Sequence, residues 1–180
     1  DLEHYPYGHS KAQAEALVQA SGRRSLIVRP TLVAGPAAPA FAGLVKLARM
    51  PVCPLFAGGK ARLQPIHVAD LAEWMTDLGL RADWPSSIVE MGGPEVITAK
   101  DLLLRLRKER LGRSPRGLSF PLRPLRFALR LVEGPLWPVL PLTSGQLASF
   151  AEDGTAEASD DWQRRRATMK SLEEMVADDG

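Results

Sequence analysis

Two short apolar runs, SLIVR at 25–29 and SSIVEM at 86–91, constrain the fold more than any other feature of the chain. Both are rich in β-branched residues, and Pro or Gly closes each of them. Runs of this kind are typical of buried parallel strands rather than of helices. The sequence therefore predicts at least two strands that lie inside a sheet.

Helical patterns alternate with these runs. In the segment 70–80, Leu71, Trp74, Met75 and Leu78 are spaced for one buried face. Thr98 is a good N-cap for a helix over 99–111. We expect further helices at 7–21 and 40–49. The alternation of helix and strand predicts an α/β protein with a parallel sheet.

The strand signals disappear after residue 113. We expect helices at 121–133, at 142–151 and, after the polar linker 152–161, at about 167–177. Apolar residues make up 45% of the chain and charged residues 24%, which is average for a globular protein. The single cysteine, Cys53, excludes an internal disulfide, and its apolar neighbours indicate a small buried side chain rather than a catalytic thiol.

Charge is unevenly distributed, although the net charge of +2 alone indicates no partner. Residues 101–140 hold nine Lys/Arg and three Asp/Glu, whereas residues 151–180 hold four and nine. The basic stretch either pairs with the acidic one or meets an anionic surface.

Tyr7 and Lys11 carry the chemistry that the sequence suggests. They are four residues apart on the predicted helix, so they share one face. An ammonium near a phenol favours the phenolate and lowers the phenol pKa. The tyrosine could then exchange a proton with a hydroxyl or carbonyl during hydride transfer. On its own, an exposed Tyr-Lys pair on a solvated helix is the commoner explanation.

Four segments in order resemble the short-chain dehydrogenase/reductase superfamily, in its extended and atypical branches. They are YGHSKAQAE, SLIVRPTLVAGP, LQPIHVADLAEWM and IVEMGGPEVITAKDLL, which together cover about residues 5–105. The segments LARMPVCPLFAGGKARLQPIHVADLA, GGPEVITAKDLLLRL and PLTSGQL resemble most the atypical branch related to the nucleotide-binding accessory subunit of respiratory complex I. Epimerase-like relatives are the alternative.

The resemblance implies the C-terminal part of a doubly wound parallel-sheet (Rossmann) fold with an additional helical C-terminal region. Residues 1–112 would be the C-terminal part of an NAD(P)-binding domain with inserted substrate-side elements. Residues 113–180 would be a helical region and acidic tail. The implied cofactor is NAD or NADP.

The resemblance also assigns roles to particular residues. Tyr7 would donate and accept the proton, and Lys11 would bind the nicotinamide ribose. Pro30 and Val33 would lie beside the nicotinamide, outside the carboxyl end of a strand. His67 matches the HVxD motif and is expected to pack beneath the site, although a substrate contact is the alternative.

Asp70 and Arg62 are two further residues of these motifs. Asp70 is expected to cap or start its helix. Arg62 would reach a substrate phosphate or carboxylate, although a plain surface arginine is as good an explanation. The three histidines are scattered without Cys or carboxylate spacing, so no metal site is expected.

A Gly-rich phosphate loop is missing from these 180 residues. AGGKA at 57–61 is not the G-x-G-x-x-G pattern that follows a first strand. The chain also begins without Met, almost directly in a helix. We therefore expect it to be part of a longer protein that binds NAD(P).

The segment 120–142 mixes arginine with Leu, Phe and Trp. It predicts an amphipathic helix that covers the substrate pocket or the rest of the domain. The alternative is an interfacial helix that touches a membrane or a respiratory membrane complex. No recognisable nucleic-acid module is present. We expect a cytoplasmic location, with peripheral contact to the inner membrane as the alternative.

Three functions remain open after the sequence. The first is an NAD(P)-dependent oxidoreductase that uses Tyr7 and Lys11 on a small-molecule hydroxyl or carbonyl. The second is a non-catalytic nucleotide-binding accessory subunit of a membrane complex. The third is a sugar-nucleotide epimerase or dehydratase.

Overall fold

The structure is a computed structural model that describes residues 6–35, 37–81, 87–121 and 153–177. Its helices are α1 (Pro6–Ala20), α2 (Pro39–Arg49), α3 (Val68–Leu80), α4 (Ala99–Arg105), α7 (Asp160–Arg165) and α8 (Leu172–Ala177). Its strands are β1 (Leu26–Pro30), β2 (Val33–Ala34), β3 (Cys53–Phe56), β4 (Arg62–Leu63), β5 (Ile66–His67), β6 (Ser87–Met91), β7 (Ile97–Thr98) and β8 (Gly117–Phe120).

Strands pair in parallel at three places. β1 pairs with β6 from Leu26–Ser87 to Pro30–Met91, so the two predicted strands are neighbours with their carboxyl ends together. β2 pairs with β5, and β3 pairs with β8. The pair β4–β7 is antiparallel. The predicted α/β class with a parallel sheet is therefore confirmed.

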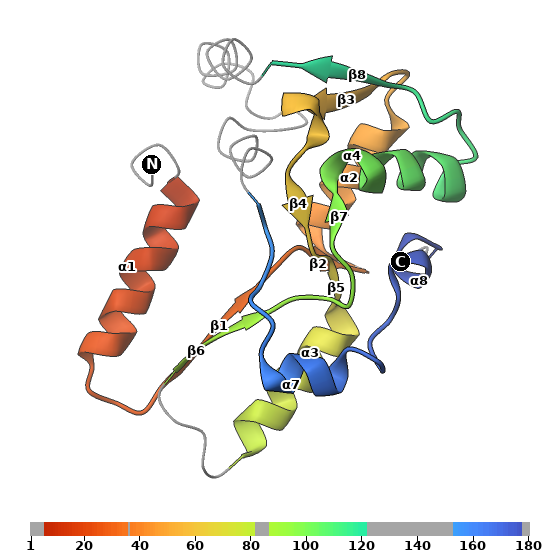
Figure 1. The fold of residues 1–180 in the computed structure, drawn as a ribbon. Coiled ribbons are helices and arrows are strands. Elements are labelled where there is room, and N and C mark those ends of the chain that lie inside the picture. The colour runs from red at the N-terminus through yellow and green to blue at the C-terminus, as the bar shows by residue number, and fades with distance from the viewer. Residues whose placement is uncertain (1–5, 36, 82–86, 122–152, 178–180) are drawn as a thin grey trace.

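One apolar core lies on one side of the β1–β6 pair. Trp74 and Leu78 of α3, Trp162 of α7 and Met91 of β6 are all buried there. Figure 1 shows α1 apart from α3 and α7, on the other side of the two strands. Both indoles donate hydrogen bonds, Trp74 to Asp161 at 2.7 Å and Trp162 to the Gly92 carbonyl at 3.0 Å. Buried tryptophans thus gain apolar contact without leaving an N–H unpaired.

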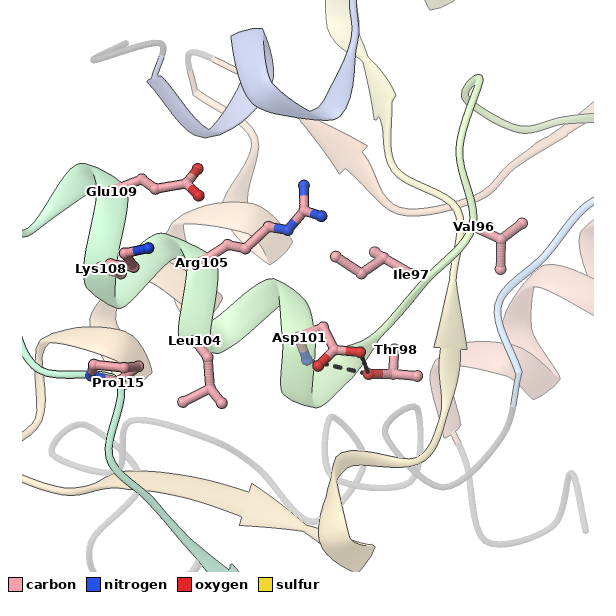
Figure 2. Close-up of a pocket in the computed structure, with 9 residues that line it drawn as sticks. All are labelled: Val96, Ile97, Thr98, Asp101, Leu104, Arg105, Lys108, Glu109 and Pro115. Atoms are coloured by element: carbon pink, nitrogen blue, oxygen red, sulfur yellow. Dashed lines mark hydrogen bonds between the residues drawn. The ribbon is translucent and has the colours of Figure 1, made fainter.

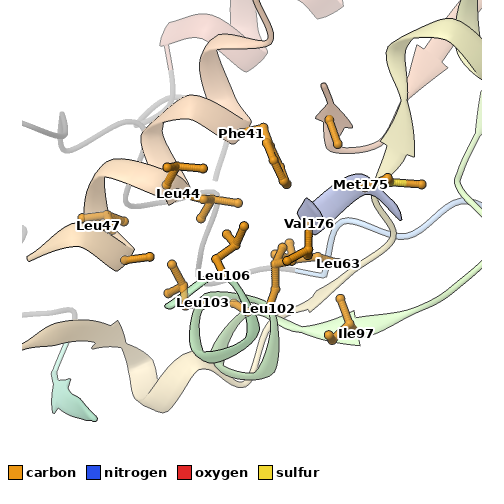
Figure 3. Packing of buried hydrophobic residues seen from close by; sticks show 14 of the residues in the cluster. Phe41, Leu44, Leu47, Leu63, Ile97, Leu102, Leu103, Leu106, Met175 and Val176 are labelled. Atoms are coloured by element: carbon orange, nitrogen blue, oxygen red, sulfur yellow. The ribbon is translucent and has the colours of Figure 1, made fainter. Parts of the chain in front are cut away.

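A second core joins α2, β3, α4 and α8. Phe41, Leu44 and Leu47 of α2 meet Leu102, Leu103 and Leu106, and Leu172, Met175 and Val176 of α8 close the cluster (Figure 3). Cys53 is fully buried in this core, as the sequence predicts. Helix α8, which follows residue 112, therefore packs in the same core as α2 and α4, which precede it.

Arg107 lies in the second core almost without solvent. It occupies the π-helical turn Leu106–Arg110 that extends α4, and it is 5% exposed. Its guanidinium donates to the carbonyls of Ala48, Met50 and Pro51 at 2.5–2.8 Å and to that of Ser114 at 2.6 Å. These acceptors include carbonyls at the C-terminus of α2, where the helix dipole favours a cation.

The structure corrects three expectations. The strand β8 lies where no strand was expected, because its partner β3 is distant in the chain. Met75 is 46% exposed, although Leu71, Trp74 and Leu78 are buried as predicted. Over the C-terminal part, α7 occupies the end of the expected linker, and α8 covers only the second half of the expected helix. The helices predicted at 121–133 and 142–151 lie outside the described residues.

Helix α1 is the least packed of the described helices. Nearly all the side chains described on it are exposed, including Leu17 at 74% and Val18 at 42%. Its sequence forms a helix through Ala, Gln, Glu and Lys, which have high intrinsic propensity, and Gly22 follows its end at φ 65°. None of the helices in the described part of the chain is both long enough and apolar enough to span a membrane.

Candidate functional site

The carboxyl ends of β1 and β6 form the edge at which the sequence places a dinucleotide. Pro30 ends β1 and is exposed, while Val33, three residues later, is half-buried. The Thr31 amide donates to the Met91 carbonyl at 2.9 Å, and its hydroxyl donates to the Gln64 carbonyl at 2.5 Å. The segment 31–34 is therefore held between the end of β6 and the start of β5.

Gly35 brings this segment against His67. It has φ of +115°, and a Cβ at this position would lie 2.9 Å from His67 Nε2. The neighbouring residue Ala34 pairs with His67 in the β2–β5 ladder. Only glycine combines this backbone conformation with such a close approach.

His67 is buried in this arrangement, at 3% exposure. Its Nδ1 accepts a hydrogen bond from the Ala69 amide at 3.2 Å, so His67 itself caps α3. Asp70 lies in the first turn and accepts from the Lys170 amide at 2.9 Å. The Lys170 ammonium lies 3.4 Å from His67 Nε2. Sequence reasoning did not find Lys170, because no local pattern links it to a motif a hundred residues earlier.

Lys11 and the backbone of Tyr7 belong to the same helix, α1, four residues apart. Lys11 is exposed. An ion pair links α1 to the edge described above: Arg29 of β1 donates to both carboxylate oxygens of Glu15, at 2.5 and 3.0 Å. Hydrogen bonding to Arg29 holds the pKa of Glu15 below its usual value. Arg29 also lies 4.0 Å from Glu90 of β6.

Arg62 lies on β4, which pairs with β7 and not with β1 or β6, and Arg62 is exposed. Its backbone holds the C-terminal segment in place. The Arg62 amide donates to Asp153 Oδ1 at 2.8 Å, and its carbonyl accepts from the Gly154 amide at 2.7 Å. The Arg62 guanidinium is therefore free of a structural role in this contact.

Gln64 is a buried polar residue that the sequence did not single out. Its side-chain amide donates to the Gly93 carbonyl at 2.8 Å, and its oxygen accepts from the Ala156 amide at 2.9 Å. A Cβ on Gly92 would meet the Gln64 side chain at 2.5 Å. Gln64 thus joins the end of β6 to the returning C-terminal segment.

The glycines of AGGKA do not form a phosphate loop. Ala57–Gly59 is a 3-10 turn between β3 and β4, and a Cβ on Gly59 would lie 2.8 Å from the Lys100 backbone nitrogen. Gly59 is therefore required by packing against the start of α4.

A separate open cleft of about 570 Å³ lies along α4. Figure 2 shows its lining: Val96, Ile97, Thr98, Asp101, Leu104, Arg105, Lys108, Glu109 and Pro115. The Thr98 hydroxyl donates to Asp101 at 2.6 Å and accepts from its amide, so this pair caps the helix as predicted. None of the site residues expected from the sequence lines this cleft.

The edge at 30–35 could hold the nicotinamide end of a dinucleotide. Pro30 and Val33 both keep surface that a flat ring could cover. Among residues 6–35, 37–81, 87–121 and 153–177, no three His, Cys, Asp or Glu side chains lie where they could hold a metal ion.

Comparison with solved structures places this geometry in a known fold. The UDP-glucose 4-epimerase of Thermotoga maritima, solved with UDP-glucose, matches with a TM-score of 0.62 at 16% identity. The match covers 96% of this chain and 51% of the epimerase. A variant of the UDP-glucuronic acid 4-epimerase of Bacillus cereus, solved with NAD and a fluorinated UDP-sugar, matches with a TM-score of 0.62 at 14% identity over 97% of this chain and 51% of that one.

A third match is TunA, an NAD-dependent NDP-hexosamine 5,6-dehydratase of tunicamycin biosynthesis. Its TM-score is 0.59 at 19% identity, over 95% of this chain and 51% of TunA. The chain has the Rossmann fold of these enzymes. It spans about half of their length. No protein-family model matches the sequence, and no curated protein matches it.

Proposed function

We propose that this chain supplies the acid/base side of an NAD(P)-dependent active site of the short-chain dehydrogenase/reductase type. The observation that carries the proposal is the paired carboxyl end of β1 and β6, which runs into the tightly held segment 31–35. Ligands of open α/β sheets bind outside such ends. The solved structures with this fold include several with NAD.

The chain's own residues would each perform one step. Tyr7 would take the proton of a substrate hydroxyl as the carbon is oxidised, and would return it in the reverse direction. Lys11 would favour the phenolate of Tyr7 and hydrogen-bond a ribose hydroxyl. Pro30 and Val33 would cover one face of the nicotinamide. NAD or NADP, when bound, would accept or return the hydride.

A sugar nucleotide is the substrate class that we favour. By name, the T. maritima and B. cereus proteins are UDP-sugar epimerases, and TunA is an NDP-sugar dehydratase. In this chain, the guanidinium of the exposed Arg62 could bind a diphosphate through bidentate hydrogen bonds.

Tyr7→Phe and Lys11→Met in the full-length protein test the proposal, with NAD⁺, NADP⁺ and UDP-glucose as probes. We expect Tyr7→Phe to keep cofactor affinity in calorimetry and to lose turnover about a hundredfold or more. Tyr5→Phe, two residues away, is the matched control and should keep full turnover. Equal turnover in Tyr7→Phe and wild type would refute the acid/base role. Cofactor binding without any turnover in the wild type would favour the non-catalytic accessory function instead.

The substrate class has its own test. UDP-glucose binding should weaken about tenfold in Arg62→Gln and stay unchanged in Arg23→Gln, which alters another exposed arginine. Binding that is equal in the two variants would contradict a diphosphate contact at Arg62.

A further inference from the structure

A surface with both apolar and basic side chains forms where α2 ends and β8 begins. We call it the basic–apolar face. It consists of Arg49, Met50, Val52, Arg113, Arg116, Leu118 and Phe120. Hydrogen bonds join its two segments, from the Arg113 guanidinium to the Arg49 carbonyl and from the Cys53 amide to the Arg116 carbonyl at 3.2 Å. The β3–β8 ladder then continues this contact.

The apolar members of this face are exposed to solvent. Leu118 is 54% exposed, Val52 49%, Met50 40% and Phe120 36%. Single exposed apolar residues need no explanation, but a contiguous group marks an interaction surface. Four such side chains lie on two segments that hydrogen bonds hold side by side, and we take them as one group of this kind.

Every charged residue within the two segments 49–52 and 113–120 is an arginine. The sequence 105–116 that leads into the face holds six Lys/Arg and one Glu. The acidic residues Asp160 and Asp161 lie on α7, which Figure 1 shows far from β8. The charged side chains of the face itself are therefore all positive, which suits an anionic partner.

A rigid support lies directly beneath the face. Arg107 donates to the Met50 and Pro51 carbonyls on one segment and to the Ser114 carbonyl on the other. The exposed apolar side chains are thus held by a buried hydrogen-bonded residue rather than carried on a loose loop.

We propose that the basic–apolar face docks on the surface of an anionic lipid bilayer. Arginines attract the anionic headgroups, and the apolar side chains between them enter the headgroup boundary. Aliphatic side chains such as Met50, Val52 and Leu118 would gain little on a nucleic-acid backbone, whose recognition relies on phosphate contacts and stacking. The chain continues after the face into PLRPLRF, which repeats the same mixture in sequence. The inference is independent of the proposed function.

Vesicle co-sedimentation of the full-length protein tests the proposal. The probes are phosphatidylcholine vesicles with and without phosphatidylserine. We expect binding only to the anionic vesicles, weakened by salt. Arg113→Gln/Arg116→Gln should weaken it about thirtyfold, because each arginine near such a surface contributes roughly fivefold. Leu118→Ser/Phe120→Ser should also weaken it at least tenfold.

Matched controls keep these results interpretable. Arg23→Gln/Lys100→Gln removes two exposed cations elsewhere, and Leu80→Ser removes a side chain that is 80% exposed at the end of α3. Both should bind as wild type does, and circular dichroism should show every variant folded. Four results would each overturn the proposal: no binding of the wild type, equal binding to neutral vesicles, unchanged binding in Arg113→Gln/Arg116→Gln, or binding to duplex DNA in preference to vesicles.

Discussion

Arg29 donates two hydrogen bonds to the Glu15 carboxylate, and this pair fixes α1 against the carboxyl end of β1. Glu15 is two turns of helix beyond Tyr7 and one beyond Lys11. The pair is partly exposed, with 47% of the Arg29 side chain and 23% of the Glu15 side chain accessible. An ion pair this exposed contributes little to stability, so we expect it to orient the helix rather than to stabilise the fold.

Arg29→Lys should separate orientation from stability. Lysine keeps the charge but cannot hold a carboxylate with two parallel hydrogen bonds. We expect turnover to fall about tenfold, with almost no change in the midpoint of thermal unfolding. Arg23→Lys, on an exposed turn, is the control. A large loss of thermal stability in Arg29→Lys would show that the pair is structural instead.

Gly35→Ala should destabilise the protein by about 2 kcal/mol, because the backbone is left-handed and the added Cβ would press on His67. Cofactor affinity should fall as well if the segment 31–35 binds the nicotinamide. Gly79→Ala is the opposite case, since a Cβ there meets nothing within 4 Å inside α3. It should stabilise by about 0.5–1 kcal/mol in urea denaturation. If both variants changed the free energy of unfolding in the same direction, the proposed difference between the two glycines would be wrong.

Asp161 makes the contact between α7 and α3 sensitive to acid. Partial burial raises the pKa of its carboxyl, but hydrogen bonds from Arg81, Arg164 and Trp74 outweigh burial and lower it to about 2. The folded pKa thus lies below the unfolded value, so the stabilisation is present above about pH 4 and is lost as the pH falls towards 2.

Asp161→Asn should remove this dependence and cost about 1–2 kcal/mol at pH 7. Asp160→Asn alters an exposed neighbour and should leave both the pH dependence of stability and the stability at pH 7 unchanged. The measurement is the free energy of unfolding between pH 2 and 7. A slope that persists in Asp161→Asn would assign the acid sensitivity to another group.

Arg107→Met should destabilise the protein by about 3 kcal/mol, because it strands four carbonyl acceptors in or near the core. Arg107→Lys should recover only part of this, since a single ammonium cannot reach all four. Lys108→Gln, on the adjacent exposed position, is the control. Urea denaturation with a loss below 1 kcal/mol in Arg107→Met would show that water replaces the guanidinium.

The local elements of this protein could be predicted from its sequence. The β-branched runs became β1 and β6, Thr98 caps α4, and Cys53 is buried in a strand. Each of these depends on residues within one or two turns of each other, where propensity and periodicity are informative. The roles of Tyr7 and Lys11 came from the resemblance of ordered motifs, and they stay predictions.

Contacts between distant segments decided the rest. Strand β8 forms only because β3 is buried beside it, and α7 is fixed by Trp74 and Arg81, residues far away along the chain. The pairing of Glu15 with Arg29 and the approach of Lys170 to His67 have no local signal at all. The sequence by itself determined the elements whose signals are local, such as β1, β6 and α3, because that choice depends on neighbouring residues. Only the tertiary structure decided which side chains support the edge at 30–35, because packing selects partners across the whole chain.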